Sequence, residues 1–169
     1  EGRKVNYIHV RGLEVVKSST CNIAKKCQQE LIDHLLKKNH TDEYYQSWIG
    51  SLKSAVFTDI NSEDLSLRIK VSKNLDTYKN ITLPVILARK RKKRERGLLL
   101  NEIDYIVTST TPTLDCVETA DFKGKFDKTY YWNRIILPPL IRILKVVHPH
   151  INWNQYKINK KGQLKLLLE

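Results

Sequence analysis

The densest cluster of chemically active side chains runs from Arg89 to Arg96, where seven of eight residues are basic and Glu95 is the one acid. Arginine and lysine at this density attract polyanions, and a nucleic-acid backbone is the commonest polyanion. The whole chain has thirty basic and eighteen acidic residues, which give a formal net charge of +12 at pH 7. The cluster therefore predicts phosphate binding, although a merely solvated helix face would have the same composition.

The side chains that catalysis would need form no recognisable pattern. A hydrolase or transferase uses a nucleophile with a base, or carboxylates that hold a metal. The acids stand in pairs such as Asp42-Glu43 and Glu63-Asp64, where helix starts favour acids anyway. His148 and His150 could bind a metal, but no cysteine or acid lies nearby in the sequence. We predict no catalytic residue, cofactor or metal on this chain, with a small metalloenzyme that uses these histidines as an alternative.

Three cysteines, Cys21, Cys27 and Cys116, lack zinc-site spacing and are odd in number. They favour reduced thiols, and therefore a cytoplasmic protein, or a nuclear one if the source is eukaryotic. The longest apolar run, 135–144, contains two prolines and an arginine. It is a poor membrane span, so we expect no membrane partner.

The basic cluster ends a predicted helix that begins near Leu83. Pro84 suits a first helical position, and Gly97 suits the position after a helix end. Before this helix, Leu65 to Val71 alternates apolar and polar residues, which predicts a half-buried strand with a basic outer face. After it we predict a strand around Asp104–Val107 and then a polar loop.

Longer helices are predicted on either side of this region. Apolar residues recur every fourth position over 22–38 and predict an amphipathic helix, with Ser18, Ser19 or Thr20 as its N-cap. A second, antiparallel helix begins at Asp42. A last helix runs from about Asp127 to Val147, and Pro138-Pro139 must bend or interrupt it. Few signals of fixed structure follow His148.

The N-terminal residues predict a β-ribbon. KVNYIHV and LEVV alternate in polarity and read as two short strands joined near Arg11-Gly12. A lone two-stranded ribbon is barely stable in water, so we expect these strands to complete a sheet of another chain.

Several stretches resemble the C-terminal end of family B DNA polymerases of the archaeal type. RGLEVVKSST followed by NIAKKCQ is similar to the family's RGLEIVRRDW and IAKETQ. LDTYKNITLPVILARK is similar to LHEYKAIGPHVAVAKK, and DYIV to GYIV. FDKTYYWNRIILPPLIRIL is similar to YDAEYYIENQVLPAVLRIL. The stretches follow the family's order, from the last palm hairpin through the thumb.

This resemblance implies a mainly helical α+β fold: a C-terminal palm hairpin over 1–19, a thumb over 20–148 and a tail over 149–169. It implies a thumb that grips the primer–template duplex by its phosphates, which fix position without reading sequence. The candidate contacts are Arg11, Gly12, Lys17, Lys79, Arg89 and Lys90, with longer-range attraction from Arg91, Lys92, Lys93 and Arg94.

The family's metal-binding aspartates lie in motifs that these residues do not contain. The resemblance therefore implies the small part of a split DNA polymerase, or a C-terminal fragment, in a heterodimer for DNA replication. A large catalytic subunit would carry the nucleotidyltransferase site and its Mg²⁺. The alternative is a stand-alone basic nucleic-acid-binding protein.

The resemblance weakens at three places, one of which is Pro84, where relatives have a histidine that could make a polar contact. Lys17-Ser18-Ser19-Thr20 replaces the family's arginine-arginine-aspartate-tryptophan, so a charge, a capping acid and an apolar anchor are missing. Relatives end in a sliding-clamp box, where Lys161 stands in place of the glutamine. In that frame Leu164, Leu167 and Leu168 also fall on the box, whereas a truncated frame would start at Gln163 and use Leu166; clamp binding by this tail stays a hypothesis.

Overall fold

The computed structural model describes residues 13, 17, 19–37, 41–70, 82–94, 102–110 and 115–159, without the side chains of 84 and 91–94. The fold of this part is mainly helical α+β, as predicted. The elements are α1 (Asn22–Leu36), α2 (Asp42–Ala55), α3 (Ser62–Leu65), β1 (Leu67–Lys70), α4 (Leu83–Arg94), β2 (Glu102–Ser109), β3 (Asp115–Glu118), α5 (Lys128–Tyr130) and α6 (Leu137–Val147). A π-helical stretch, Tyr131–Ile136, joins α5 to α6, and 3₁₀ turns lie at Thr119–Asp121 and Trp153–Tyr156.

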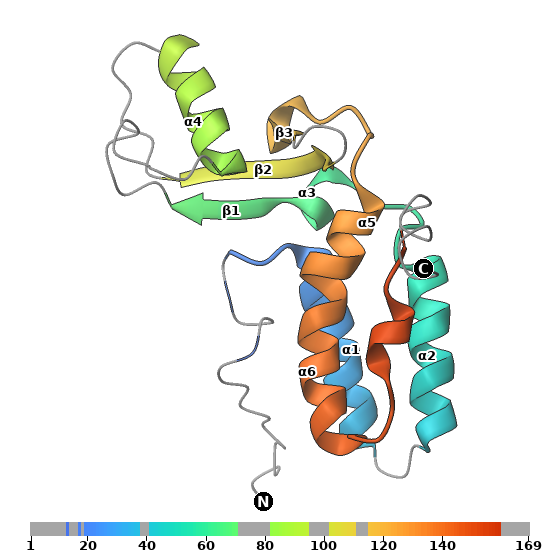
Figure 1. Cartoon of the computed structure of the whole chain (residues 1–169). Coiled ribbons are helices and arrows are strands. Elements are labelled where there is room, and N and C mark those ends of the chain that lie inside the picture. The colour runs from blue at the N-terminus through green and yellow to red at the C-terminus, as the bar shows by residue number, and fades with distance from the viewer. Residues whose placement is uncertain are drawn as a thin grey trace, which may run out of the picture.

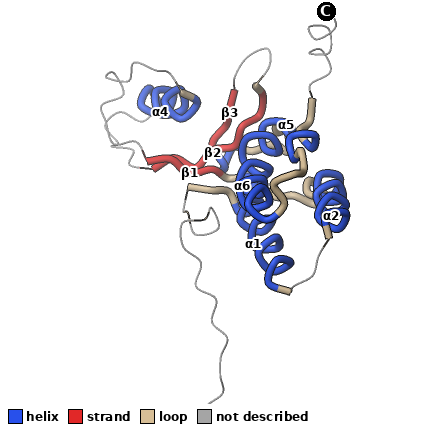
Figure 2. Tube along the Cα trace, turned by 60° about the horizontal axis from the view of Figure 1, so that its bottom comes forward, coloured by secondary structure: helices blue, strands red, loops and turns tan. Residues whose placement is uncertain are grey.

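The sheet separates two helical parts of the molecule. In Figures 1 and 2, α4 lies on one side of the sheet, and α1, α2 and α6 lie on the other. One hydrophobic core joins both sides, because it includes Leu83 and Leu87 of α4 as well as Leu31 of α1 and Leu140 of α6. The basic helix is therefore held at the opposite end of the molecule from the long helices.

The sheet is antiparallel, with the strand order β1-β2-β3. Arg68 faces Asp104 and Leu67 faces Tyr105 across β1 and β2. The predicted strands over 65–71 and 104–107 are confirmed with shifted ends, because Leu65 belongs to α3, where the Asn61 side chain caps the N–H of Asp64 at 2.9 Å. β3 was not predicted, since only four residues, Asp115–Glu118, form it.

The two helices predicted over 22–38 and from Asp42 are present. The apolar stripe of α1 is buried at Ile23, Cys27 and Leu31. Its predicted N-caps are wrong: the N-cap is Cys21, which makes no side-chain cap hydrogen bond. The Cys21 side chain is 1% exposed, so packing of the thiol into the core determines where the helix begins. In α2 the cap follows the usual rule, because the Thr41 hydroxyl accepts the N–H of Tyr44 at 3.3 Å.

The last helix accommodates its two prolines by changing from α-helical to π-helical hydrogen bonding before them. Asp127 caps it, accepting the N–H of Tyr130 at 2.8 Å. From Tyr131 to Ile136 the helix is π-helical, and the N–H of Leu137 donates to the carbonyl of Trp132, five residues earlier. Proline has no N–H for an α-helical bond. The predicted interruption is therefore confirmed as a π-helical stretch immediately before Pro138-Pro139.

Residues 148–159 are fixed in place, although the sequence contained few signals of structure there. Trp153 is 0% exposed and lies in the common core. Trp132 Nε1 donates to the carbonyl of Tyr156 at 2.8 Å, and Asn133 exchanges two hydrogen bonds with the backbone of Ile158. These contacts join residues more than twenty positions apart, and such pairs leave no periodic pattern in the sequence.

The predicted N-terminal ribbon and the expected lack of a membrane span complete the comparison with the sequence. The two predicted N-terminal strands lie outside the described residues, apart from Leu13. Within the described part of the chain, no helix is long and apolar enough to cross a membrane.

Candidate nucleic-acid interface

The basic helix α4 is anchored through its first two turns. Leu83, Val85, Leu87 and Ala88 are buried. The helix packs on β2 and β3, and the Cys116 thiol of β3 donates to the carbonyl of Leu83 at 3.7 Å. This half of α4 therefore belongs to the core and fixes the direction of the other half (Figure 1).

The second half of α4 carries the predicted phosphate contacts. Arg89 is half-buried at the edge of the core and Lys90 is exposed, and the backbone of 91–94 continues the helix. The backbone of 89–94 extends over about 8 Å of helix, so consecutive basic residues follow one another along the end of α4. Cations at a helix C-terminus are also favoured by the helix dipole. α4 therefore concentrates positive charge on a rigid support.

The predicted basic face of β1 is partly neutralised. Arg68 Nε donates to Asp104 Oδ1 at 2.7 Å and Nη2 donates to Oδ2 at 2.8 Å, a two-bond pair across the strands. The hydrogen bond from Arg68 lowers the pKa of the Asp104 carboxyl, and the same bond raises the pKa of Arg68. Both groups stay charged at neutral pH, so they cancel, and Arg68 adds little net attraction for an anion.

A polar hollow of about 530 Å³ lies beside this pair, at the start of α1. Its wall contains Lys25 and Arg68, but also Glu63 and Asp104. Two acids balance two bases, so the hollow has no net positive charge with which to bind phosphate.

The histidines considered as metal ligands are hydrogen-bonded to an acid of α2. His148 Nδ1 donates to Asp42 Oδ1 at 2.5 Å, and His150 Nε2 contacts Asp42 Oδ2. The hydrogen bond from His150 lowers the pKa of Asp42, and the bond from His148 acts in the same direction. Among the described residues, no group of three side chains is placed to hold a metal ion. These hydrogen bonds connect α2 to the segment that follows α6.

The cysteines are free and buried. Burial raises the pKa of Cys21 to about 11 and the pKa values of Cys27 and Cys116 to about 12. Thiols in this state are poor nucleophiles at neutral pH. The cysteines therefore fill the core and do not form a reactive site.

The structure brings together only part of the predicted DNA-contact set. Arg89 and Lys90 lie together on α4, and the backbone of Arg91–Arg94 continues from them, whereas Lys17 lies exposed where the chain enters α1. Arg11, Gly12 and Lys79 lie outside the described residues. The same holds for the clamp candidates Gln163, Leu164, Leu166, Leu167 and Leu168.

Sequence reasoning missed Asp42 as the partner of both histidines. It was assigned only to the start of a helix, a role that it also has as the first residue of α2. The two histidines at alternate positions, 148 and 150, indicated a pair that could share one partner. Nothing local indicated an acid so far away in the sequence.

Comparison with known proteins places these features in a family context. A family model for DNA polymerase family B matches residues 1–147. The chain is 27% identical over 145 residues to a DNA polymerase of Methanocaldococcus jannaschii, covering 83% of this chain and 9% of that protein. It is 25% identical over 158 residues to a DNA polymerase of Archaeoglobus fulgidus, covering 80% of this chain and 20% of that protein.

The fold has a counterpart among solved structures. The family B DNA polymerase from the hyperthermophilic archaeon Pyrobaculum calidifontis matches with a TM-score of 0.58 and 22% identity, over 76% of this chain and 18% of that one. The chain thus spans at most one fifth of the length of these relatives.

Proposed function

The chain belongs to DNA polymerase family B, and from this premise we propose that it is the thumb region of such a polymerase and holds duplex DNA by its phosphates. The observation that carries the proposal is α4, whose apolar half is buried on the sheet and whose helix continues into the basic run, with Arg89 half-buried and Lys90 exposed. A rigidly mounted cluster of arginine and lysine suits a polymer with regularly spaced negative charge.

The proposed contact is independent of DNA sequence. Arg89 and Lys90 are the members of the contact set on α4 whose side chains the structure describes, and the backbone of Arg91–Arg94 continues the helix. Lys17 would add a contact near the start of α1, and Arg11, Gly12 and Lys79 would add others. Phosphate contacts hold a duplex in position without preferring one base over another, as copying any template requires. The grip slows DNA dissociation and keeps the primer end aligned, which is a proximity effect.

We propose that bond formation takes place on another part of the polymerase. The chain spans 9% to 20% of the relatives compared above. Residues 1–19 would complete the palm sheet of a larger catalytic polypeptide, and 20–148 would form the thumb. That polypeptide would hold two Mg²⁺ ions, which stabilise the attacking and leaving oxygens. A tail over 149–169 that contacts a sliding clamp is a further part of the proposal.

The duplex grip is tested by salt-dependent binding. The triple variant Arg89→Gln, Lys90→Gln and Arg91→Gln is compared with the unchanged chain on a fluorescent primer–template duplex between 50 and 200 mM salt. Each lost phosphate contact makes the plot of log affinity against log salt less steep by about one. We expect weaker binding, a slope smaller in magnitude by about one to three, and no change in base preference.

The matched control removes the same total charge elsewhere. Lys37→Gln, Lys145→Gln and Lys157→Gln change three exposed lysines on the helical side of the molecule, away from α4. This control should keep most of the affinity and slope. Equal slopes for both triple variants would contradict a localised grip, because they would show that only net charge matters.

The division of labour is tested by primer extension with Mg²⁺ and all four deoxynucleotides. The chain alone should add no nucleotide, since the catalytic carboxylates are proposed to lie elsewhere. Extension by the purified chain, surviving removal of traces of other polymerases, would overturn this part of the proposal. The proposed phosphate contacts of α4 would still be tested separately by the salt-dependent binding experiment.

A further inference from the structure

The hydroxyl of Tyr131 lies where the sheet meets the helical side of the molecule. Tyr131 is the first residue of the π-helical stretch before α6, and it is 0% exposed. Its hydroxyl donates to the carbonyl of Leu65 at 2.8 Å and accepts the N–H of Val107 at 3.2 Å. Leu65 ends α3 and Val107 lies in β2, so one oxygen joins three elements from distant parts of the chain.

This oxygen takes the place of the next rung of the β1–β2 ladder. The antiparallel register pairs Leu67 with Tyr105, and the pairing of the two strands ends there. Two residues further in the same register, Leu65 would stand opposite Val107. Facing residues of an antiparallel ladder bond directly at alternate pairs. Here the Tyr131 hydroxyl is bonded to both backbone groups instead, so the helical side of the molecule supplies the end of the ladder.

The carbonyl of Val107 is also held by the helical side. It accepts the N–H of Asp127 at 3.0 Å. The Asp127 carboxylate caps the last helix at Tyr130, and it accepts the hydroxyl of Thr110 at 2.5 Å. Thr110 directly follows β2, whose pairing with β3 is irregular between Val107 and Ser109. The helical side therefore contacts β2 through a polar junction, at the point where the pairing of β2 on both edges departs from a regular ladder.

This junction supports the strand on which α4 is mounted, because α4 packs on β2 and β3. Leu65 and Val107 are both 0% exposed, so water cannot take over the bonds of a missing hydroxyl. Without it, the N–H of Val107 and the carbonyl of Leu65 would be buried and unpaired, which is costly. The strands can avoid that cost only by closing the rung themselves. That closure would move β2, and α4 with it, relative to Tyr131.

We infer that the Tyr131 hydroxyl is a positioning group, which sets the direction of α4 relative to the helical side of the molecule. Its consequence for DNA rests on the proposed function. The contacts of α4 and of Lys17, at the entry to α1, can be made on one duplex only at a fixed relative orientation, because the phosphates are regularly spaced. Tyr131 itself is buried and contacts no DNA.

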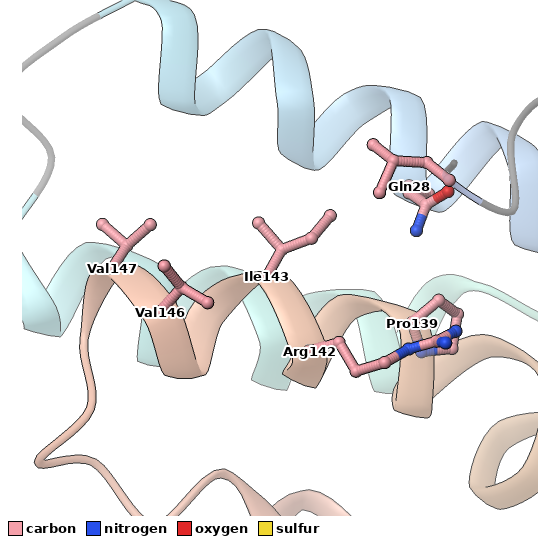
Figure 3. Close-up of a pocket in the computed structure, with 7 residues that line it drawn as sticks. Gln28, Pro139, Arg142, Ile143, Val146 and Val147 are labelled. Atoms are coloured by element: carbon pink, nitrogen blue, oxygen red, sulfur yellow. The ribbon is translucent and has the colours of Figure 1, made fainter. Parts of the chain in front are cut away.

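The distance between two spin labels measures this orientation in the full chain without DNA. One label is attached to Lys90→Cys on α4, and the other to Val146→Cys on α6. Val146 is 81% exposed, and Figure 3 shows it on α6 beside the groove that separates this helix from α1. The three native cysteines are buried, so the two introduced thiols are the ones that react.

Tyr131→Phe removes the hydroxyl and keeps the ring in the core. It should shift or broaden the distribution of distances between the two labels, because the sheet is no longer held at its end. The matched control is Tyr130→Phe, which makes the same chemical change at the neighbouring residue, outside the junction. This control should keep the distance distribution of the unchanged chain.

The salt dependence of duplex binding shows whether the orientation matters for DNA. It is measured at a temperature at which both tyrosine variants are fully folded. Tyr131→Phe should bind more weakly, with a salt slope less steep by about one, because the contacts of α4 and Lys17 are no longer made together. Tyr130→Phe should keep both the affinity and the slope. A hydroxyl with a merely structural role would lower Tm in Tyr131→Phe and leave the slope unchanged.

Identical distance distributions in Tyr131→Phe and Tyr130→Phe would overturn the inference. If Tyr131→Phe failed to fold, Thr110→Val would decide, because it removes only the hydroxyl bond to Asp127 from the same junction. An unchanged distribution in that variant would overturn the inference as well. Altered distances with an unchanged salt slope would overturn the role in DNA binding. Failure of the α4 triple variant would instead remove the proposed function and leave the distance result standing.

Discussion

At the scale of single residues, the contribution of a basic side chain to DNA binding depends on whether a neighbouring acid neutralises its charge. Arg68 and Lys90 are both exposed basic residues, one on β1 and one on α4. Arg68 is held by two hydrogen bonds to Asp104, whereas Lys90 belongs to a run of consecutive basic residues. Their identical formal charges should therefore make different contributions to DNA binding.

The first prediction compares these two residues by single substitution. Lys90→Gln should weaken duplex binding and make its salt slope less steep by about one, because one phosphate contact is lost. Arg68→Gln should leave the slope nearly unchanged, because its charge is already compensated by Asp104. Fluorescence anisotropy over a salt series measures both. A larger effect from Arg68→Gln would mean that the sheet, and not α4, faces the DNA.

Asp42 gives the second prediction, because its two histidine partners lie 106 and 108 residues away. Asp42→Asn should lower Tm at pH 7 by loosening the segment after α6. The folded pKa of Asp42 lies below its usual 3.8. Its stabilisation is therefore present above about pH 4 and is lost as the pH falls through the folded value. The Tm difference between the unchanged chain and Asp42→Asn should be full at pH 6 and shrink toward pH 3.

The control for this prediction is Glu43→Gln, which removes an acid from the same first turn of α2 without touching the histidines. It should lower Tm less at pH 7, because it loses a carboxylate near the helix N-terminus and local hydrogen bonds of the first turn, and no contact with the segment after α6. Equal losses from both variants would show that the two histidines add nothing to stability.

At the scale of elements, the sequence predicts those helices and strands whose formation depends on neighbouring residues in the chain. The helices over 22–36 and 42–55 were predicted because apolar residues recur at helical spacing, and the helix from Leu83 was predicted from Pro84 at its start and Gly97 after its expected end. The start of α1 was not, because burial of Cys21 prevailed over the capping preference of Ser19 and Thr20. The short strand β3 was missed, because a sheet neighbour, and not its own four residues, gives it structure.

The third prediction concerns the mounting of α4. Leu87 is buried, while its neighbour Ile86 is half-exposed on the same helix. Leu87→Ala should cost about 2–5 kcal/mol of unfolding free energy, because it leaves a cavity in the core. It should also weaken duplex binding without changing any charge, because the basic half of α4 loses its fixed direction. Ile86→Ala should do much less of both in urea unfolding and anisotropy experiments. Unchanged DNA affinity in a folded Leu87→Ala variant would show that the charges act without a rigid mount.

At the scale of the whole molecule, the candidate site was only partly predictable from sequence. The basic run 89–94 and its helix were visible, because charge and helical spacing are local properties. The neutralisation of Arg68 and the sharing of Asp42 by two histidines depend on contacts between distant residues. The position of 148–159 against the core likewise follows from single long-range bonds, such as that between Trp132 and the carbonyl of Tyr156.

The last prediction separates this packed segment from the residues after it. Deleting 160–169 removes none of the described contacts, so Tm and duplex affinity should stay near those of the full chain. Deleting 148–169 removes Trp153, which is 0% exposed, and both histidine contacts with Asp42. Loss of a buried tryptophan side chain alone costs about 3–5 kcal/mol. The longer deletion should therefore unfold at a much lower temperature or fail to fold, as measured by circular dichroism. If the two deletions melted alike, Trp153 would contribute nothing to the core, and the boundary of the folded unit would lie at Val147.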